Sequence, residues 1–349
     1  MEKAFPSRSL SNWFSRHKRP LPWRNTYEPY HVWLSEIMLQ QTRVEQALPY
    51  YKNFLKKFPN VHKLANAKEQ DVLKAWEGLG YYSRARNLHQ AAQKITAEFG
   101  GKIPNNYNQL IELPGFGEYV AAAVASIAFN EPRPVVDGNV FRVFSRYYGI
   151  QSDIALPKTK KEFLKLGNLI LPKNNSRDFN QSLMELGALI CTPKNPFCTN
   201  CPLQKNCFAF LNSRQGDFPV KTKKQKRPVK NFAAVLLREK SGVWLAKRKQ
   251  KLLHGLYEFP QIEFNPLADQ KKELEKLFSK QFGVSLRIKQ EIARSAHEYT
   301  HFRQNVHLFE AAFKKKTDNA VSVSFFSKKQ IKKLPLSNVN RKLLGQIPN

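Results

Sequence analysis

The stretch LPGFGEYVAAAV, residues 113–124, is a tight Gly-x-Gly turn that runs directly into an alanine-rich apolar segment, which predicts a helix. Gly115 and Gly117 let the backbone turn with its N–H groups pointing outward, and the following helix adds the positive end of its dipole. Such a turn binds a phosphate, although the same short pattern also joins ordinary helices. Leu113, Gly115 and Gly117 are therefore candidate DNA-binding residues, and Tyr119, two positions later, requires an explanation.

Charge and composition narrow the class of protein. The 349 residues contain 58 Lys and Arg against 27 Asp and Glu, a net charge of +31, which indicates a polyanionic partner such as nucleic acid. A generally basic proteome would also raise the charge, so charge alone leaves both explanations open. The sequence has neither a long apolar run nor the apolar core of a secretory signal. We expect a cytoplasmic, nucleoid-associated protein of bacterial type that is not secreted and has no membrane partner.

Hydrophobic periodicity divides the chain into an all-α part and an α+β part. Residues 1–218 predict a helical domain, residues 219–230 (PVKTKKQKRPVK) a basic linker that also suits phosphate, and residues 231–349 a mainly stranded domain with one helix. The helices are expected at 30–42, 72–80, 85–99, 120–129 and 139–149 in the first domain and at 267–282 in the second. Strands are expected at 232–239, 242–249, 286–294, 307–313 and 321–326.

The four cysteines of the chain lie within one short segment. Cys191, Cys198, Cys201 and Cys207 are separated by six, two and five residues. A reducing compartment disfavours disulfides, so the thiols are candidate metal ligands. Structural zinc sites usually pair two short Cys-x-x-Cys spacings, and only one such spacing is present, so the pattern favours an iron–sulfur cluster while zinc remains an alternative.

The cysteine spacing, together with motifs that precede it, carries a family resemblance. Cys-x6-Cys-x2-Cys-x5-Cys after a glycine hairpin resembles the [4Fe–4S] loop of the helix-hairpin-helix DNA glycosylases, the endonuclease III superfamily. Within that superfamily the chain resembles MutY-type adenine DNA glycosylases through LSEIMLQQT (34–42), GLGYYSRARNL (78–88), LPGFG (113–117), VDGNV (136–140) and its extra C-terminal domain. The resemblance implies a [4Fe–4S] cluster on the four cysteines, a phosphate-gripping hairpin, and a wedge into duplex DNA made by Gln41, Tyr81 and Tyr82.

Two carboxylates suit cleavage of an N-glycosidic bond, which needs a proton on the departing base and negative charge beside the cationic sugar. Glu36 lies in an apolar helix, so partial desolvation should raise its pKa, although a lone Glu on a helix is more often a surface residue. Asp137 is a natural N-cap for the helix after it, and backbone N–H groups should keep it ionised. By resemblance, Glu36 is the adenine-protonating acid, Asp137 the catalytic Asp, and Asn139 the polar residue that organises the site.

Tyr119 stands where lyase members of the superfamily carry a Lys. That lysine amine attacks C1′ and forms a Schiff base, which a phenol cannot do, so the residue predicts base removal without strand cleavage. The resemblance further implies that Tyr119 is able to hydrogen-bond the catalytic Asp. The alternative is a half-buried aromatic side chain that packs the hairpin.

Residues 231–349 resemble the Nudix-like domain that inspects the base opposite the adenine. Aligned on Gly283, the positions of the acidic Nudix ligands hold Lys276, Leu277, Lys280 and Gln281, so we predict no diphosphate hydrolysis. The family's usual Phe-Ser-His recognition triplet is replaced by Tyr299, Thr300 and His301. The hydroxyl and the aromatic ring are kept, which leaves 8-oxoguanine recognition plausible. A solvated hairpin with a single surface His is the other interpretation.

The sequence therefore predicts a monomeric, monofunctional adenine DNA glycosylase that acts on duplex DNA with A:8-oxoguanine or A:G mispairs. Two alternatives remain at this stage. One is a related glycosylase for oxidised pyrimidines or T:G mispairs, and the other is a non-catalytic mismatch-binding module.

Overall fold

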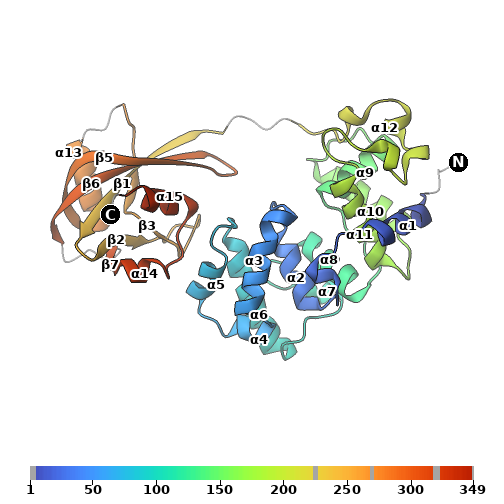
Figure 1. The fold of residues 1–349 in the computed structure, drawn as a ribbon, viewed down its shortest axis with the longest axis horizontal. Coiled ribbons are helices and arrows are strands. Elements are labelled where there is room, and N and C mark those ends of the chain that lie inside the picture. The colour runs from blue at the N-terminus through green and yellow to red at the C-terminus, as the bar shows by residue number, and fades with distance from the viewer. Residues whose placement is uncertain (1–4, 223–226, 268–270, 317–322, 348–349) are drawn as a thin grey trace. The chain divides into compact units, whose positions relative to one another are not determined.

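The computed structural model describes residues 5–222, 227–267, 271–316 and 323–347 (Figure 1). The chain forms two compact units. Unit 1 comprises Met1–Ala47, Asn60–Ala65 and Gln90–Lys224, and unit 2 comprises Leu48–Pro59, Asn66–His89 and Gln225–Asn349. Parts of the predicted linker (223–226), helix (268–270) and strand (321–322) lie outside the described residues. Both units contain segments of the first 218 residues, and the domain limits at 218 and 231 stay a prediction.

Unit 1 is helical, as predicted. Its helices are α1 (Ser7–His17), α2 (Pro29–Met38), α4 (Val61–Ala65), α7 (Tyr107–Leu110), α8 (Glu118–Phe129), α9 (Gly138–Tyr148), α10 (Pro157–Ile170), α11 (Ser176–Leu189) and α12 (Phe208–Leu211), while α3 (Val44–Lys57) and α6 (Ser83–Phe99) belong partly to each unit. The predicted helix 30–42 ends at Met38, because the following residues turn and Gln41 has a positive φ of 60°. A buried aromatic and aliphatic core from α1, α9, α10 and α11, which includes the fully buried Phe144, Phe163 and Phe179, fixes α9 and α11, two of the helices that line the candidate site.

Unit 2 contains α5 (Glu69–Ala75), the remaining parts of α3 and α6, and a seven-stranded mixed sheet. The strands are β1 (Val229–Glu239), β2 (Gly242–Lys247), β3 (Tyr257–Glu258), β4 (Gln261–Glu263), β5 (Val284–Glu298), β6 (Arg303–Lys316) and β7 (Val323–Ser327). The sheet order is β3-β2-β1-β6-β5, with β4 beside β1 and β7 beside β2, and β1 runs parallel to β6.

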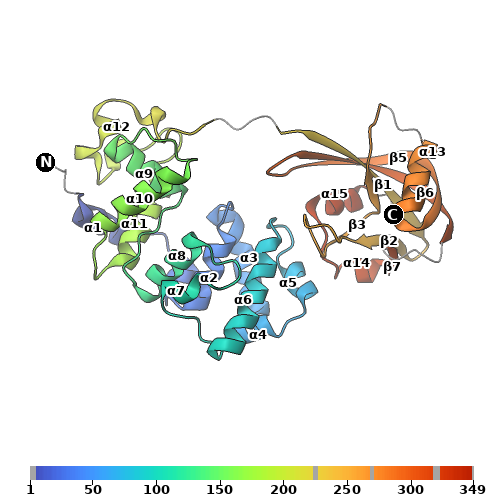
Figure 2. The same ribbon diagram turned by 180° about the vertical axis from the view of Figure 1, so that it is seen from behind.

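Side chains of β1 alternate between two cores. Val235 and Leu237 pack with residues of α13 (Lys271–Phe282), whereas Ala234 and Leu236 pack with α14 (Lys328–Ile331) and α15 (Asn338–Gln346). Successive residues of a strand point to opposite faces, so β1 is covered on both sides (Figures 1 and 2). The predicted α+β class of this domain is confirmed. None of the described helices has the length and apolar character needed to cross a bilayer.

Candidate active site

A cavity of about 570 Å³ in unit 1 gathers most of the predicted site residues. Its walls come from α2, α8, α9 and α11 and from the turn after α2. Glu36, Gln41, Tyr119, Asp137 and Asn139 all line it, although they are far apart in sequence. The fold therefore brings both candidate carboxylates, the tyrosine and one wedge residue to a single place.

Glu36 is buried in the wall of this cavity. Its side chain sits on α2, where neighbouring residues such as Trp33 and Ile37 are buried as well, and it is 5% exposed. Burial raises the pKa of Glu36 to about 7; the hydrogen bond from Tyr119 opposes the rise, and the charge of Asp137 adds to it. The predicted desolvation of Glu36 is confirmed.

The partner of Tyr119 differs from the expectation. Its hydroxyl donates to Oε2 of Glu36 at 2.7 Å, whereas the resemblance implied a bond to Asp137. Burial, reinforced by the neighbouring charges of Glu36 and Asp137, raises the pKa of Tyr119 well above its ordinary value, which keeps the phenol protonated and able to donate.

Asp137 is the N-cap of α9, as predicted. Its Oδ1 accepts the N–H of Val140 at 2.8 Å, and its Oδ2 accepts Nδ2 of Asn139 at 2.8 Å. These bonds lower the pKa of Asp137, as expected for an N-cap carboxylate, but burial outweighs them and raises it. The carboxylate is thus well oriented yet desolvated, a state that makes its negative charge more effective toward a nearby cation.

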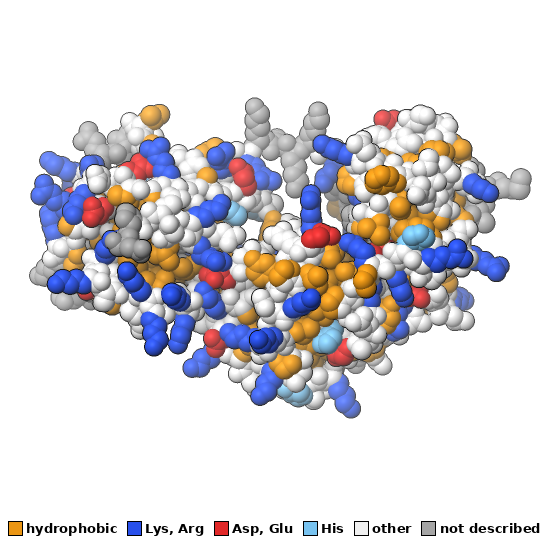
Figure 3. All heavy atoms as spheres, viewed as in Figure 1, with side chains coloured by type: hydrophobic (Ala, Val, Ile, Leu, Met, Phe, Trp, Pro, Cys, Tyr) orange, Lys and Arg blue, Asp and Glu red, His pale blue; other side chains and the backbone are white. Residues whose placement is uncertain are grey.

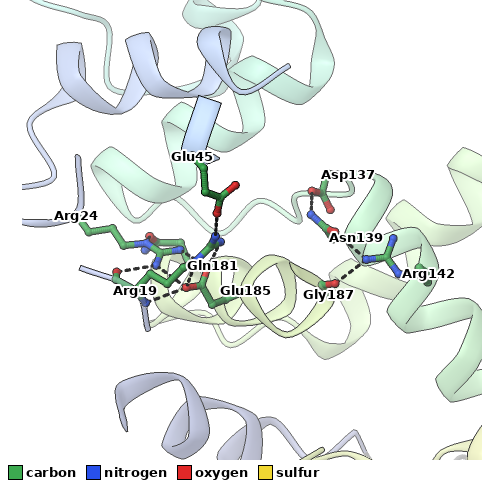
Figure 4. A network of polar contacts seen from close by, with 9 residues as sticks. All are labelled: Arg19, Arg24, Glu45, Asp137, Asn139, Arg142, Gln181, Glu185 and Gly187. Carbon is green, nitrogen blue, oxygen red and sulfur yellow. Dashed lines mark hydrogen bonds and ion pairs between the residues drawn. The ribbon is translucent and has the colours of Figure 1, made fainter. Parts of the chain in front are cut away.

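Helix α9 also links Asp137 to the cysteine segment through Arg142, whose contacts with Asn139 and Gly187 are drawn in Figure 4. Arg142 donates from Nη2 to Oδ1 of Asn139 at 2.9 Å and to the carbonyl oxygen of Gly187 at 2.6 Å. Its Nε donates to the carbonyl oxygen of Cys191 at 2.6 Å. The orientation of Asn139, and through it that of Asp137, is fixed by a side chain that also holds the first cysteine's backbone.

The cavity contains charged residues that the sequence analysis missed. Glu185 on α11 binds both Arg19 and Arg24, and Gln181 accepts a hydrogen bond from Arg24 (Figure 4). Glu185 lies in the apolar stretch SLMELGAL, the same signal that marked Glu36, so that residue was within reach of sequence reasoning. The two arginines carried no such signal, because more than 150 positions separate them from Glu185.

The hairpin adopts the predicted turn. Gly115 has a φ of 78°, a conformation that favours glycine, and Gly117 is the N-cap of α8. The turn closes through a hydrogen bond from the N–H of Phe116 to the carbonyl oxygen of Leu113, and both of these side chains are buried. The side chain of Leu113 therefore anchors the hairpin and is not available at the surface.

The three predicted wedge residues differ in exposure. Gln41 is exposed, and Tyr81, in unit 2, is 47% exposed with a φ of 49°, an uncommon conformation for a bulky residue. Tyr82 is only 4% exposed, and its hydroxyl accepts the N–H of Gly78 and donates to the carbonyl oxygen of Leu336. The prediction that Tyr82 is a wedge residue was wrong, because its ring is part of the packing of unit 2.

The four cysteines lie around two short 3₁₀ turns, Cys198–Asn200 and Gln204–Asn206, and all four are free thiols. Burial and the other three thiols raise the pKa of Cys201 to about 12, so the sulfurs are near one another. Arg146 donates to Sγ of Cys191 at 3.4 Å. Four thiols without a competing ligand type fit an iron–sulfur cluster. Within the described ranges, no group of three His, Cys, Asp or Glu side chains is arranged to hold a single metal ion.

The predicted recognition triplet, Tyr299, Thr300 and His301, lies at the turn between β5 and β6 in unit 2. Thr300 and His301 are exposed, whereas the ring of Tyr299 stacks on Phe302 with centroids 5.1 Å apart. The Thr300 hydroxyl lies 3.1 Å from that of Tyr81, so a residue predicted to be a wedge contacts a residue predicted to recognise the opposing base. In α13, Lys276, Leu277 and Lys280 are exposed.

The helical fold, the glycine hairpin and the two buried carboxylates define a helix-hairpin-helix DNA glycosylase joined to a Nudix-type domain. Residues 34–169 match the HhH-GPD superfamily of base excision DNA repair proteins, and residues 232–346 match the NUDIX domain. A thermostable thymine-DNA glycosylase of known structure superposes with a TM-score of 0.54 at 29% identity, over 59% of this chain and 95% of that one.

Relatives that match most of the chain identify its family within this class of glycosylases. The chain is 37% identical to the adenine DNA glycosylase of Buchnera aphidicola subsp. Schizaphis graminum over 302 residues, which cover 86% of this chain and 85% of the relative. It is 36% identical to the Arabidopsis thaliana adenine DNA glycosylase, over 86% of this chain and 56% of the relative. The chain belongs to the adenine DNA glycosylase family and is a DNA N-glycosylase of base excision repair.

Proposed function

We propose that this enzyme removes adenine mispaired with 8-oxoguanine, and less rapidly adenine mispaired with guanine, by hydrolysis that leaves the DNA strand intact. The observation that carries the proposal is the pair formed by Tyr119 and Glu36. A protonated phenol occupies the place of the lyase lysine, and it orients a carboxyl group whose pKa is about 7.

Glu36 is the general acid of the proposed reaction. A pKa near neutrality leaves a substantial protonated fraction at working pH and still allows proton transfer to the adenine ring. Because Tyr119 donates to Oε2, we assign the transferable proton to Oε1. Protonation of the base lets its bond to C1′ break, with the bonding electrons leaving on the adenine.

Asp137 is the anion that faces the resulting sugar cation. Its two oxygens are fixed by Val140 and Asn139, so its charge requires no rearrangement when the oxocarbenium ion forms. The carboxylate either stabilises this cation directly or bonds to C1′ until a water replaces it. The water's oxygen ends on C1′, and the proton that it loses restores the protonated form of Glu36, directly or through solvent. The product is an abasic site in an unbroken strand.

The remaining residues hold the duplex and the cofactor. We assign the hairpin backbone at Gly115 and Gly117 to a phosphate, and Gln41 and Tyr81 to the wedge. Thr300 and His301 contact the base opposite the adenine. Cys191, Cys198, Cys201 and Cys207 would bind a [4Fe–4S] cluster, which ties the cysteine segment into one structural unit. The proposed partner is duplex DNA bound by a monomer in the cytoplasm.

A single-turnover assay with duplexes that differ only in the mispair tests this function. We expect alkali-labile sites from A:8-oxoguanine and, more slowly, from A:G, with no strand break before alkali. Efficient thymine release from T:G, or a protein–DNA adduct trapped by borohydride, would contradict the proposal. Mispair binding without turnover, unchanged in Glu36→Gln, would instead indicate a non-catalytic module.

A further inference from the structure

Glu185 is the most heavily bonded carboxylate among the described residues of unit 1, and the proposed reaction does not use it. Its side chain is 1% exposed. Oε1 accepts from the backbone N–H and Nε of Arg19 and from Nη1 of Arg24, and Oε2 accepts from Nη2 of each arginine, all at 2.9–3.0 Å. Burial alone would raise the pKa of Glu185, but these bonds outweigh it and lower the pKa to about 2.

Arg24 is held from three sides. Besides its two bonds to Glu185, its Nε donates to Oε1 of Gln181 at 3.0 Å, and its guanidinium lies 5.4 Å from the ring centroid of Phe14. Its side chain is 10% exposed, so water provides little screening of its charge. Arg24 and Glu36 line the same cavity, and the charge of Arg24 acts on Glu36.

The cavity wall has equal numbers of basic and acidic side chains, whereas the whole chain does not. Cations outnumber anions 58 to 27 in the whole chain. The cavity wall has four arginines (Arg19, Arg24, Arg43 and Arg142) and four carboxylates (Glu36, Glu45, Asp137 and Glu185). Of the carboxylates, Glu185 is the one that contacts Arg24 directly, so its removal would leave that arginine's charge uncompensated near the acid.

We propose that Glu185 is a positioning residue for the glycosylase reaction: it fixes Arg24 in the cavity wall and cancels the positive charge that Arg24 would otherwise place beside Glu36. This inference rests on the proposed role of Glu36 as the acid. The groups that face Glu36 are Tyr119, which donates to it, Asp137, whose charge favours its protonated form, and Arg24, whose charge favours its ionised form.

The direction of the expected change follows from these signs. Glu36 acts when protonated, so the rate is full below its pKa and falls as pH rises through it, which forms the alkaline limb of the pH–rate profile. An uncompensated Arg24 favours the carboxylate form of Glu36. Loss of Glu185 should therefore move the alkaline limb to lower pH, by about one unit for one uncompensated charge in the cavity wall.

The test is the pH dependence of single-turnover adenine release by the full-length protein, measured between about pH 5 and pH 9. Glu185→Gln keeps the shape and removes the charge, so its alkaline limb should move down by about one unit. Arg24→Gln should move the limb up, and the double variant should return it toward the wild-type position. Glu98→Gln, a matched loss of an exposed carboxylate on α6, is the control and should leave the limb in place.

The outcomes separate this inference from the proposed function. An unmoved limb in folded Glu185→Gln, with Glu36→Gln still inactive, would overturn the role of Glu185 and leave Glu36 as the acid. Release of adenine by Glu36→Gln would overturn the proposed function itself, and this inference with it. If Glu185→Gln does not fold, the pH–rate profile of Arg24→Gln decides between the outcomes. An alkaline limb that does not move to higher pH in that variant contradicts the charge argument.

Discussion

The hydroxyl of Tyr119 donates a 2.7 Å hydrogen bond to Oε2 of Glu36, which lies 83 positions earlier in the sequence. One side chain thus has two consequences for the chemistry. The phenol has no amine that would attack the sugar, and it also orients the carboxyl group proposed to protonate the base. The Tyr119 side chain therefore both stands in the place of the lyase lysine and supports the proposed general acid, Glu36.

Removal of the Tyr119 hydroxyl should shift the working pH upward. The hydrogen bond lowers the pKa of Glu36, so Tyr119→Phe should raise that pKa further and move the alkaline limb to higher pH. We expect a shift of roughly half a unit to one unit, which corresponds to a hydrogen bond worth about 1 kcal/mol. Adenine release as a function of pH measures it. The same change at Tyr107, which the structure places outside the cavity, is the control, and a downward shift in Tyr119→Phe would contradict the bond's assigned effect.

Burial of Glu36 should reduce stability at high pH. The pKa of its side chain is about 7 in the folded protein and 4.5 as its ordinary value, so the folded state binds the proton more tightly. The contribution of Glu36 to stability is therefore greatest below about pH 4.5 and decreases as pH rises toward 7, by about 3 kcal/mol in total. Glu36→Gln should be more stable than wild type at about pH 8 by that order, and the gain should disappear below about pH 4.5. Urea denaturation at both pH values measures the difference, with Glu112→Gln as an exposed control; an equal effect at both values would contradict the linkage.

Much of the fold was predictable because its signals are local. Apolar spacing located α8, α9 and the longer strands β1, β2, β5, β6 and β7, but not the two short strands β3 and β4. Asp137 was identified as an N-cap from its residue type and its position. The family resemblance, which implied that Tyr82 is a wedge residue, could not show that its ring is buried. The ring's burial depends on packing within unit 2, where its hydroxyl reaches Leu336, and no pattern near residue 82 encodes that contact.

Electrostatics was the least predictable property of the site. Sequence shows that Asp137 accepts hydrogen bonds, and those bonds alone imply a lowered pKa. The structure adds a desolvation that outweighs them, and its size depends on how distant segments close over the carboxylate. Arg19 and Arg24 were missed for the same reason, since their interaction with Glu185 exists only after α11 packs beside the 19–24 segment.

The cysteine segment should lose its cofactor when a single thiol is replaced. If the four thiolates hold a [4Fe–4S] cluster, the purified protein should absorb near about 400 nm and contain iron and sulfide, and Cys201→Ser should lose both. Stoichiometric zinc in a colourless protein would contradict the assignment.

Arg146 should be required for the cysteine segment to bind its cofactor, although Arg146 is not itself a ligand. It is 3% exposed and donates to Sγ of Cys191 and to the carbonyl oxygens of Thr192 and Pro193, so it holds the backbone around the first cysteine. Arg146→Met should lower the iron content and destabilise the protein by about 3 kcal/mol or more, because several carbonyl groups lose a charged donor. Metal analysis and thermal unfolding measure the two effects. Arg133→Met, which removes a half-buried arginine that pairs with Glu131, is the control. Full iron content in Arg146→Met would show that the cysteines hold the cofactor without it.

The exposed turn of unit 2 should control which opposing base is accepted. Thr300 and His301 present a hydroxyl and an imidazole at the end of the β5–β6 hairpin, whereas Tyr299 is held by stacking on Phe302. In the double variant Thr300→Val, His301→Ala, the preference for A:8-oxoguanine over A:G should fall about five- to tenfold, equivalent to one lost hydrogen bond of about 1 to 1.4 kcal/mol. Single-turnover rates on both duplexes measure this ratio. The control is His254→Ala, which alters another exposed histidine of unit 2. A proportional loss on both duplexes would mean that the turn binds DNA without inspecting the base, because only a contact to the lesion changes the ratio.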